Sequence, residues 1–299
     1  MRDDKEYNLF CVGDDWQSIY RFAGSDIGYI LNFENYWGIS EKSKIETTYR
    51  FKGSLIDVSS SFIMKNPMQI KKSIVSKETD NSFALKLVEA DSYNKSVQAL
   101  NSELLSLPQN ASVFIIGRYS FDINVLKEIR NGKIINKYRP EYKVRYDNEN
   151  QRINISYVDR PDLNIQFITA HRSKGLQADY IFIINNKNDR LGFPSKIQDA
   201  PILNLLLDNC DTFEHAEERR LYYVAMTRAK EKTVMIAPPT HKQSVFIGEL
   251  KREYGEAFTQ YKTCPLCGGK LIMRSGPYGN FYGCENYKNK DCRYKEKIN

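Results

Sequence analysis

Short apolar runs of strand length alternate along this chain with stretches in which apolar residues recur at helical intervals. The runs that favour strands cover residues 112–116, 165–169, 180–184 and 232–236, and helical spacing covers residues 53–64, 96–107, 214–230 and 244–254. Shorter strands are predicted at residues 7–12, 45–49 and 83–88, a further helix at residues 123–129, and hairpins with loops over residues 133–163. Because strands that alternate with helices form mainly parallel sheets, the pattern predicts an α/β fold.

The composition is that of a globular protein rather than a membrane-spanning or disordered one. The 299 residues suffice for one large or two small domains, and 41% of them are hydrophobic, enough for a packed core. The apolar runs are too short to cross a bilayer and none follows the basic start of the chain, so we expect a cytoplasmic protein. The net charge of +7 is compatible with nucleic-acid binding but does not by itself identify it.

Four of the six cysteines fall within the last 36 residues, with the spacing C-x2-C-x16-C-x7-C. This spacing fits a tetrahedral zinc site with four thiolate ligands, in a compartment that keeps thiols reduced. The tail has too little aliphatic content for a core of its own, so a bound Zn²⁺ would hold it together. The predicted ligands are Cys264, Cys267, Cys284 and Cys292. Cys11 and Cys210 stand apart from them and are each expected to be a small buried hydrophobic residue.

Cations and aromatic residues are interleaved in the same tail, which has eight Lys/Arg against three Asp/Glu from residue 260 onward. The segment resembles the C-terminal zinc ribbons of bacterial type I topoisomerases, which bind single-stranded DNA. By that resemblance, stacking and phosphate contacts to DNA are expected. The residues expected to make them are Lys270, Arg274, Tyr278, Phe281 and Arg293. A purely structural ribbon or a protein-docking module is the alternative.

Residues 13–22 read Gly-Asp-Asp-Trp-Gln-Ser-Ile-Tyr-Arg-Phe, which places carboxylates, an amide and aromatic rings in one loop. Residue types alone would leave it a loop, the kind of segment where sites are concentrated. The segment resembles motif III of UvrD/Rep-like superfamily 1 DNA helicases. The resemblance implies that Gln17 contacts the γ-phosphate of ATP and that Tyr20 and Phe22 stack on single-stranded bases, a grip that tolerates any sequence. Many relatives have Trp and Arg where this chain has Phe22 and Ala, so an arginine contact there is absent or moved to the preceding arginine.

Two further segments resemble motifs that contact nucleotide. Residues 47–51, Thr-Thr-Tyr-Arg-Phe, resemble motif IV, and Arg50 takes the position of the arginine that reaches the γ-phosphate. Residues 217–230 resemble motif VI, in which Arg228 would act as an arginine finger on ATP. Without the resemblance, Arg50 would be a surface arginine at a strand end and residues 217–230 an amphipathic helix. Catalytic roles are thus expected for Arg228, Arg50 and Gln17.

Residues 169–177, Thr-Ala-His-Arg-Ser-Lys-Gly-Leu-Gln, follow a predicted strand and resemble motif V. Polar loops at strand ends are common ligand sites in α/β sheets. By the resemblance, Thr169 and His171 face DNA, and Gly175 and Gln177 lie at the nucleotide. The family has Glu where this chain has Gln177, so an amide would replace the carboxylate contact. His171 alone would be an ordinary polar residue.

The four motifs stand in the family's order, with the helicase IV branch as the nearest resemblance. They imply a RecA-like (P-loop NTPase-type) second motor domain with a mainly parallel sheet, joined to a small zinc ribbon. We expect residues 1–40 to belong to the first RecA-like domain and to carry motif III, residues 41–255 to form the second, and residues 260–299 to form the ribbon. About 115 residues separate motifs IV and V, too few for the large subdomain inserted in the UvrD and Rep branch.

The sequence has no Gly-x-x-x-x-Gly-Lys-[Ser/Thr] loop and no Asp-Glu pair before motif III. The phosphate cradle and the Mg²⁺ ligands would therefore come from a first RecA-like domain, on the same polypeptide or on a separate subunit. The resemblance implies an ATP-dependent DNA helicase that moves 3′ to 5′, uses ATP with Mg²⁺ and binds single-stranded DNA. We expect this chain to be inactive by itself. The alternative is an inert DNA-binding or regulatory fragment, or half of a split helicase.

Overall fold

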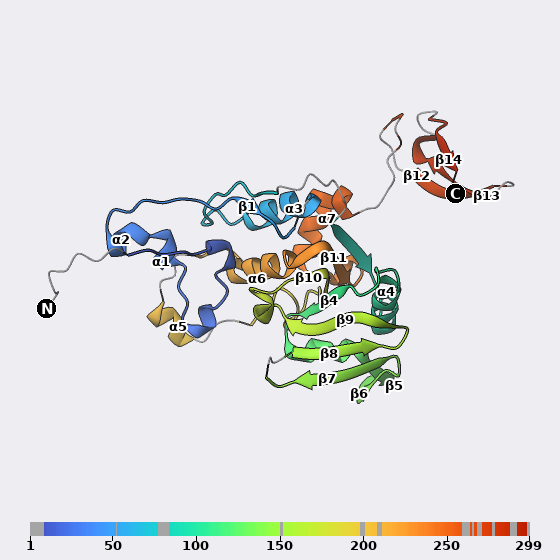
Figure 1. The fold of residues 1–299 in the computed structure, drawn as a ribbon, viewed down its shortest axis with the longest axis horizontal. Coiled ribbons are helices and arrows are strands. Elements are labelled where there is room, and N and C mark those ends of the chain that lie inside the picture. Colours follow the sequence, from blue (N-terminus) through green and yellow to red (C-terminus); the bar gives the residue numbers. More distant parts are fainter. Residues whose placement is uncertain are drawn as a thin grey trace.

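A central seven-stranded β-sheet organises the chain in a computed structural model (Figure 1). The structure describes residues 9–51, 53–76, 84–149, 152–197, 201–207, 211–258, 264, 266–267, 271–276, 279–287 and 292–297. Within these ranges, residues 204–206, 256–258, 271–276, 279–280, 285 and 297 are described by their backbone alone. None of the helices within these ranges has the length and apolar character that a bilayer crossing requires.

The sheet has a parallel part and an antiparallel part. Its order is β3 (Leu85–Glu89), β11 (Ala229–Ala237), β10 (Ala178–Ile183), β4 (Ser112–Gly117), β9 (Arg160–Thr169), β8 (Arg152–Tyr157) and β7 (Tyr142–Asp147). The first five strands run parallel, and β8 and β7 add an antiparallel edge beside β9 (Figure 1). The predicted α/β fold with a mainly parallel sheet is confirmed.

Helices cover both faces of the sheet. On one face, α3 (Ser54–Ile63), α6 (Ala216–Met226) and α7 (Val245–Phe258) share a core with Phe114, Ile181 and other sheet residues. On the other face, α4 (Tyr93–Leu105) and the 3₁₀ helix η3 (Ser120–Leu126) share a second core with sheet residues. The result is a three-layer arrangement, which buries both faces of a parallel sheet.

The sequence of buried and exposed residues along each strand depends on whether one or both faces of the strand are covered. Residues 113–117 of β4 are all buried, because helices lie on both sides of this central strand. In β8, Ile153, Ile155 and Tyr157 are buried and the residues between them are exposed, so one face is in the core and the other in solvent. A continuous apolar run and a strict alternation thus mark the centre and the edge of the same sheet.

Smaller elements complete the described chain. They are α1 (Gly28–Leu31), α2 (Phe33–Trp37), α5 (Pro201–Leu206), β1 (Thr47–Thr48), β2 (Val75–Ser76), β5 (Lys127–Arg130), β6 (Lys133–Tyr138), and the 3₁₀ helices η1 (Asp15–Gln17), η2 (Arg21–Ala23), η4 (His171–Ser173), η5 (Thr240–Lys242) and η6 (Glu285–Tyr287). The tail forms an antiparallel sheet of β12 (Leu271–Gly276), β13 (Gly279–Cys284) and β14 (Lys295–Lys297).

Three predicted elements differ from the structure. Residues 9–12 form no strand, and residues 7–8 lie outside the described ranges. The helix predicted at residues 123–129 is a 3₁₀ helix that runs into β5, because Asn131 and the following glycine have φ of 50° and 74° and turn a hairpin between β5 and β6. The helix predicted over residues 214–230 ends at Met226, where Thr233 Oγ1 donates to the Met226 carbonyl and β11 begins soon after.

The two isolated cysteines have different outcomes. Cys11 is exposed, so its predicted burial is wrong, because residues 9–14 lie along the surface and do not form a core strand. Cys210 lies outside the described residues.

Candidate nucleotide and nucleic-acid surfaces

The loop with the motif III resemblance is fixed by its tryptophan to the core that α3 and α6 share with the sheet. Trp16 is 1% exposed, and its Nε1 donates to the Ile70 carbonyl at 3.0 Å. Its ring meets the Tyr223 ring edge-on, with 5.4 Å between centroids. Asp15 is also buried and accepts from the Ile70 amide at 2.7 Å and from Lys72 Nζ at 2.5 Å. These contacts hold the η1 turn against α6 and so determine where Gln17 lies.

Gln17 is tied to its surroundings at both ends. Its side-chain Nε2 donates to the Asp14 carboxylate, and its main-chain carbonyl accepts from Lys174 Nζ at 2.9 Å. Lys174 belongs to the loop that follows β9, so this bond joins two segments that are 157 residues apart in sequence. Asp14 therefore fixes the side-chain amide of Gln17, and Lys174 of the motif V segment fixes its main chain.

Two arginines lie close to each other behind this loop. Arg50 Nε donates to Gln177 Oε1 at 3.3 Å. Arg228 is 1% exposed, and its guanidinium donates to the Val224 carbonyl at 2.8 Å and to Thr227 Oγ1 at 3.2 Å. Burial, and secondly the Arg50 charge, lower the pKa of Arg228 to about 10, and burial also lowers the pKa of Arg50. Both side chains remain cationic at neutral pH.

No carboxylate in the described part of the chain forms an ion pair with Arg50 or Arg228. A buried guanidinium without a counter-charge is costly, and an anion held against it would recover that cost. Guanidinium groups bind phosphate oxygens in bidentate geometry. Arg50, Gln177 and Arg228 therefore fit the phosphate end of a nucleotide, and Gly175, with φ of 81°, shapes the loop that leads to Gln177.

Three rings from the motif III and motif V segments form a partly exposed cluster. Tyr20, Phe22 and His171 have ring centroids 5.2 to 6.0 Å apart. The Tyr20 hydroxyl donates to the His171 carbonyl at 3.0 Å, and Lys174 Nζ lies 5.1 Å from the Tyr20 ring. Phe22 is 58% exposed, so its face is open to a ligand. Thr169, half-buried at the end of β9, lies two residues before His171.

His171 is held in its neutral form. Burial, and secondly the nearby Arg118 charge, lower its pKa from 6.5 to about 4. Arg118 is itself fixed by Glu218, with Nη2 to Oε1 at 2.7 Å and Nε to Oε2 at 3.0 Å. A neutral imidazole lies beside the aromatic rings without adding a charge, so the cations near this cluster are Lys174 and Arg118, of which Arg118 is paired with Glu218.

Acidification is expected to lower the free energy of unfolding of the wild-type chain by more than it lowers that of the His171→Gln variant. The depressed pKa means that the unfolded chain takes up a proton first, so stability is lost as pH falls from about 6.5 toward about 4. The difference between the two proteins should grow to the order of 3 kcal/mol over this range. Urea unfolding of wild type, His171→Gln and the control His241→Gln, whose side chain is exposed, measures it. Equal losses in all three proteins would refute this role for His171.

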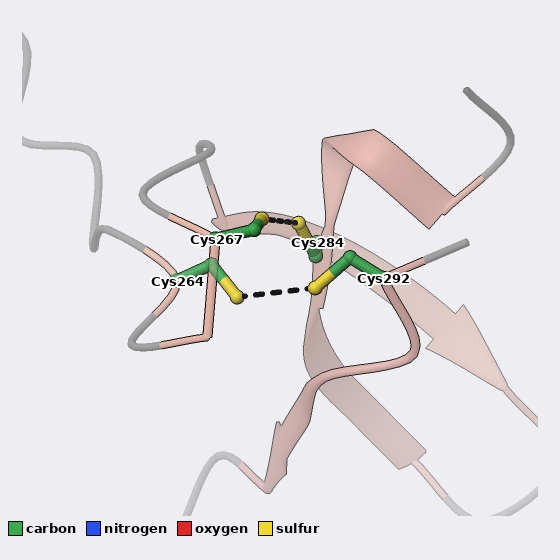
Figure 2. A group of neighbouring side chains, drawn as sticks. All are labelled: Cys264, Cys267, Cys284 and Cys292. Carbon is green, nitrogen blue, oxygen red and sulfur yellow. Dashed lines mark hydrogen bonds between the residues drawn. The ribbon is translucent and has the colours of Figure 1, made fainter. Parts of the chain in front are cut away.

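The four tail cysteines converge on one point (Figure 2). Their sulfurs all lie within 4.8 Å of one another, with Cys264 and Cys292 at 3.5 Å and Cys267 and Cys284 at 3.4 Å. A tetrahedral ion with zinc–sulfur bonds of about 2.3 Å needs sulfurs about 3.8 Å apart. The donor set and its dimensions therefore fit Zn²⁺, as the spacing predicts.

Main-chain and side-chain bonds brace this cluster. The Cys284 amide donates to the Tyr294 carbonyl at 3.2 Å, and the Cys292 amide donates to the Asn286 carbonyl at 3.4 Å. Asn286 Nδ2 lies 3.5 Å from Cys267 Sγ, where it donates to the thiolate. Donors of this kind orient the ligands of metal sites.

The predicted DNA-contacting residues of the ribbon have mixed outcomes. Lys270 and Tyr278 lie outside the described residues, and Arg274 is described by its backbone alone. Phe281 is half-buried, with Lys295 Nζ 5.5 Å from its ring, and Arg293 is exposed. An aromatic ring and cations thus occur together on the described part of the ribbon.

Sequence reasoning missed the residues that hold the two surfaces together. Lys174 was visible only as one more cation in the motif V segment, yet it contacts both Gln17 and Tyr20. Lys72, which pairs with Asp14 at 2.7 Å and with Asp15, lies in a segment without a recognisable motif. Arg118 directly follows a predicted strand, a position that could have marked it, but its partner Glu218 is one hundred residues away.

Three family models match the chain. The UvrD-like helicase C-terminal domain matches residues 147–239, and the UvrD/REP helicase N-terminal domain matches residues 3–37. The topoisomerase DNA binding C4 zinc finger matches residues 261–299. The matched segments contain the loops and the cysteine cluster described above.

Curated proteins show the same two relationships. DNA helicase IV of Escherichia coli (strain K12) is 31% identical over 231 residues, which are 77% of this chain and 30% of that protein. DNA helicase II of the same strain is 35% identical over 98 residues, covering 30% of this chain and 12% of that protein. DNA topoisomerase 1 of Methanocaldococcus jannaschii is 55% identical over 38 residues, covering 13% of this chain and 5% of that protein.

The chain thus spans less than a third of the helicases it matches. Its motif III, V and VI segments and its four-cysteine tail nevertheless lie within matched regions and have the geometry described above. The chain therefore carries segments of UvrD-like helicase N- and C-terminal domains, is related to DNA helicase IV over 77% of its length, and ends in a topoisomerase-type C4 zinc ribbon.

Proposed function

We propose that this chain forms the C-terminal part of an ATP-dependent helicase that translocates 3′ to 5′ on single-stranded DNA. The observation that carries the proposal is the contact of Lys174 with both surfaces. Its Nζ binds the carbonyl of Gln17, on the nucleotide side, and lies over the ring of Tyr20, on the DNA side. A movement of either loop would therefore displace the other, and a motor needs such a connection to couple ATP hydrolysis to movement along the strand.

The nucleotide side would complete a site whose other half binds ATP and Mg²⁺. Residues 41–255 would form the second RecA-like domain, and the first, with residues 1–40 as its last part, would hold the phosphates and the metal. Closure of the two domains would bring Arg50, Arg228 and Gln17 to the γ-phosphate. The arginines would stabilise the charge that develops during phosphoryl transfer, and Gln17 would sense the γ-phosphate. Gln177 accepts from Arg50 through its side-chain oxygen and so lies next to the predicted phosphate contact. Its side-chain amide would contact the nucleotide.

The DNA side would grip the strand by stacking and by charge. Tyr20, Phe22 and His171 offer ring faces, and every base has a face to stack on them, so binding would not depend on sequence. Residues 260–299 would add a second grip, where Phe281, Lys295 and Arg293 combine a ring with cations. Phosphate contacts of this kind make affinity fall steeply with salt.

Single-strand binding by the purified chain tests the proposal. Phe22→Ala should weaken binding by about 1–3 kcal/mol and leave the salt slope unchanged, because stacking is lost and no charge is. Removal of residues 260–299 should weaken binding and flatten the slope by about 0.7 for each phosphate that is no longer neutralised. Fluorescence anisotropy of a labelled oligothymidylate, followed over a salt series, gives both quantities.

The matched control for Phe22→Ala is Tyr146→Ala, since Tyr146 is 63% exposed on the edge strand β7, which β8 separates from β9. Equal affinity of the Phe22 and Tyr146 variants would contradict the stacking role. Unchanged affinity and slope after removal of residues 260–299 would mean that the ribbon docks protein rather than DNA.

A further inference from the structure

A cavity outside the motif loops lies at the carboxyl ends of the parallel strands. Its volume is about 590 Å³, within the range of about 300–1,000 Å³ that small-ligand sites occupy. Phe121, Asn124 and Val125 line it after β4, and residues 184–189 line it after β10. Residues 90–93 and Ser96, around the start of α4, close a third side. Apolar and polar groups both contribute to the lining.

The topology of the sheet explains why a cavity forms here. β4 and β10 are neighbours, but the chain leaves β4 toward β9 and leaves β10 toward β11, in opposite directions. Such a switch point leaves a crevice between the two outgoing loops, where ligands of open α/β sheets bind. The motif loops use the carboxyl end of β9, so the cavity lies further along the same sheet edge.

The cavity presents the groups that a nucleobase needs. Phe121 at its lining is 46% exposed and stacks on Tyr119, with centroids 4.9 Å apart and planes at 9°. The Tyr93 hydroxyl is buried without a hydrogen-bond partner among the described residues. Asn124 and Asn188 add side-chain amides that likewise make no hydrogen bond within the described part of the chain. Ring faces with amides beside them are the means by which proteins hold unpaired bases.

One lysine of the lining is available to a phosphate. The three lining carboxylates already have partners: Asp91 pairs with Lys95 at 2.6 Å, Asp189 pairs with Lys187 at 2.9 Å, and Asp122 accepts from Asn185 Nδ2 at 2.9 Å. Lys242 is exposed on the lining and has no acidic partner among the residues that the structure describes. Lys242 could therefore pair with the phosphate next to a bound base.

Arg118 is near both the motif cluster and the rings at the cavity. Its charge acts on His171, its guanidinium lies 4.8 Å from the Tyr119 ring, and Tyr119 stacks on Phe121. His171 meets the Phe22 ring edge-on at 5.2 Å. A strand that stacks on Phe22 would pass Arg118 on its way to the cavity.

We propose that this cavity takes up one base of the single strand, stacked on Phe121 and bonded at its edge by the free amides and Tyr93. The inference rests on the proposed function, because it needs a strand on the Phe22 and His171 cluster. It adds a base-holding subsite that neither the motifs nor the ribbon provides.

A cavity-filling substitution with a matched partner on the same helix tests the subsite. Ser96 lines the cavity from α4, whereas Ser102 is exposed on the same helix and does not line it. The full chain and its Ser96→Phe and Ser102→Phe variants are titrated with a labelled oligothymidylate. Ser96→Phe should lower affinity at least about fivefold, the equivalent of one stacked base, and Ser102→Phe should not.

A second readout locates the base itself. Strands with one 2-aminopurine, placed at successive positions, should brighten at one position on wild type and on Ser102→Phe, because a base held apart from its neighbours loses the stacking that quenches it. Ser96→Phe should abolish the bright position. Phe121→Ala provides an independent variant whose exposed side chain makes misfolding a minor concern, and it should lower affinity by a similar factor relative to Tyr146→Ala.

The outcomes separate this inference from the proposed function. Binding by wild type with equal affinity and equal 2-aminopurine emission for Ser96→Phe and Ser102→Phe would overturn the subsite and leave the helicase proposal intact. Equal affinity of Phe121→Ala and Tyr146→Ala would overturn the subsite in the same way. No strand binding by wild type would overturn the proposed function, and the subsite with it.

Discussion

Replacement of Arg228 by alanine is expected to lower DNA-stimulated ATP turnover by roughly 10³–10⁵-fold, measured in this chain joined to a companion half with a Gly-x-x-x-x-Gly-Lys-[Ser/Thr] loop. Arg228 is buried without a carboxylate partner among the described residues, so we expect an anion of the nucleotide to be its counter-charge. Its loss would remove charge stabilisation from the transition state and leave strand binding nearly unchanged. Steady-state turnover and oligothymidylate affinity, measured side by side, separate the two effects.

Two controls distinguish this catalytic role from a structural one. Arg219→Ala removes a buried arginine that is paired with Glu249 at 2.7 Å and 2.9 Å, and should lower the unfolding temperature without a specific loss of turnover. Arg252→Ala removes a 72% exposed arginine and should change neither. Turnover by Arg228→Ala within a factor of a few of wild type would contradict the arginine-finger assignment.

Removal of zinc is expected to unfold the tail while the seven-stranded domain stays folded. Structural Zn²⁺ contributes apparent binding free energies of about 10–16 kcal/mol, and small zinc modules lose their fold without it. The described tail has a cluster of cysteines with two half-buried tyrosines, Tyr282 and Tyr294, as its core, too little to hold it together otherwise. Limited proteolysis after chelation should cut within residues 260–299 and spare residues 84–258.

Metal content provides the matching measurement. Wild type and Cys11→Ser should each carry one Zn²⁺ per chain, since Cys11 is exposed and far from the cluster in sequence. Cys284→Ser should lose the ion, because it removes one of four thiolates that lie within 4.8 Å of one another. A Cys284→Ser protein with full metal and a protease-resistant tail would refute the four-cysteine site.

The features that sequence predicted well are those with local causes. The continuous apolar run at residues 113–116 predicts a strand that is covered on both faces, and the structure buries all four of these residues. The cysteine spacing predicts the zinc cluster because its ligands come from one short segment. Element ends were less predictable, as where Asn131 and the next glycine turn a hairpin rather than end a helix.

The contacts that join the site come from long-range packing and leave no local pattern. Lys174 reaches Gln17 across 157 residues, and Arg118 reaches Glu218 across one hundred. Trp16 is the anchor of its loop because the segment after α3 brings the Ile70 carbonyl to it and α6 brings the Tyr223 ring. The motif resemblance singled out residues that the fold brings into contact, such as Tyr20 with His171 and Arg50 with Gln177, but only the fold shows which residues hold the others in place.

ATP turnover by the separate and the joined halves tests most directly whether this chain supplies the second side of an ATP cleft. The chain alone should show no turnover with or without DNA, because it contains no phosphate-binding loop. The Walker-bearing half alone should turn over slowly, and the joined protein should be strongly stimulated by single-stranded DNA. DNA-stimulated turnover by the isolated chain that is lost on Arg228→Ala, or a joined protein that binds DNA yet is no faster than the Walker-bearing half, would contradict it.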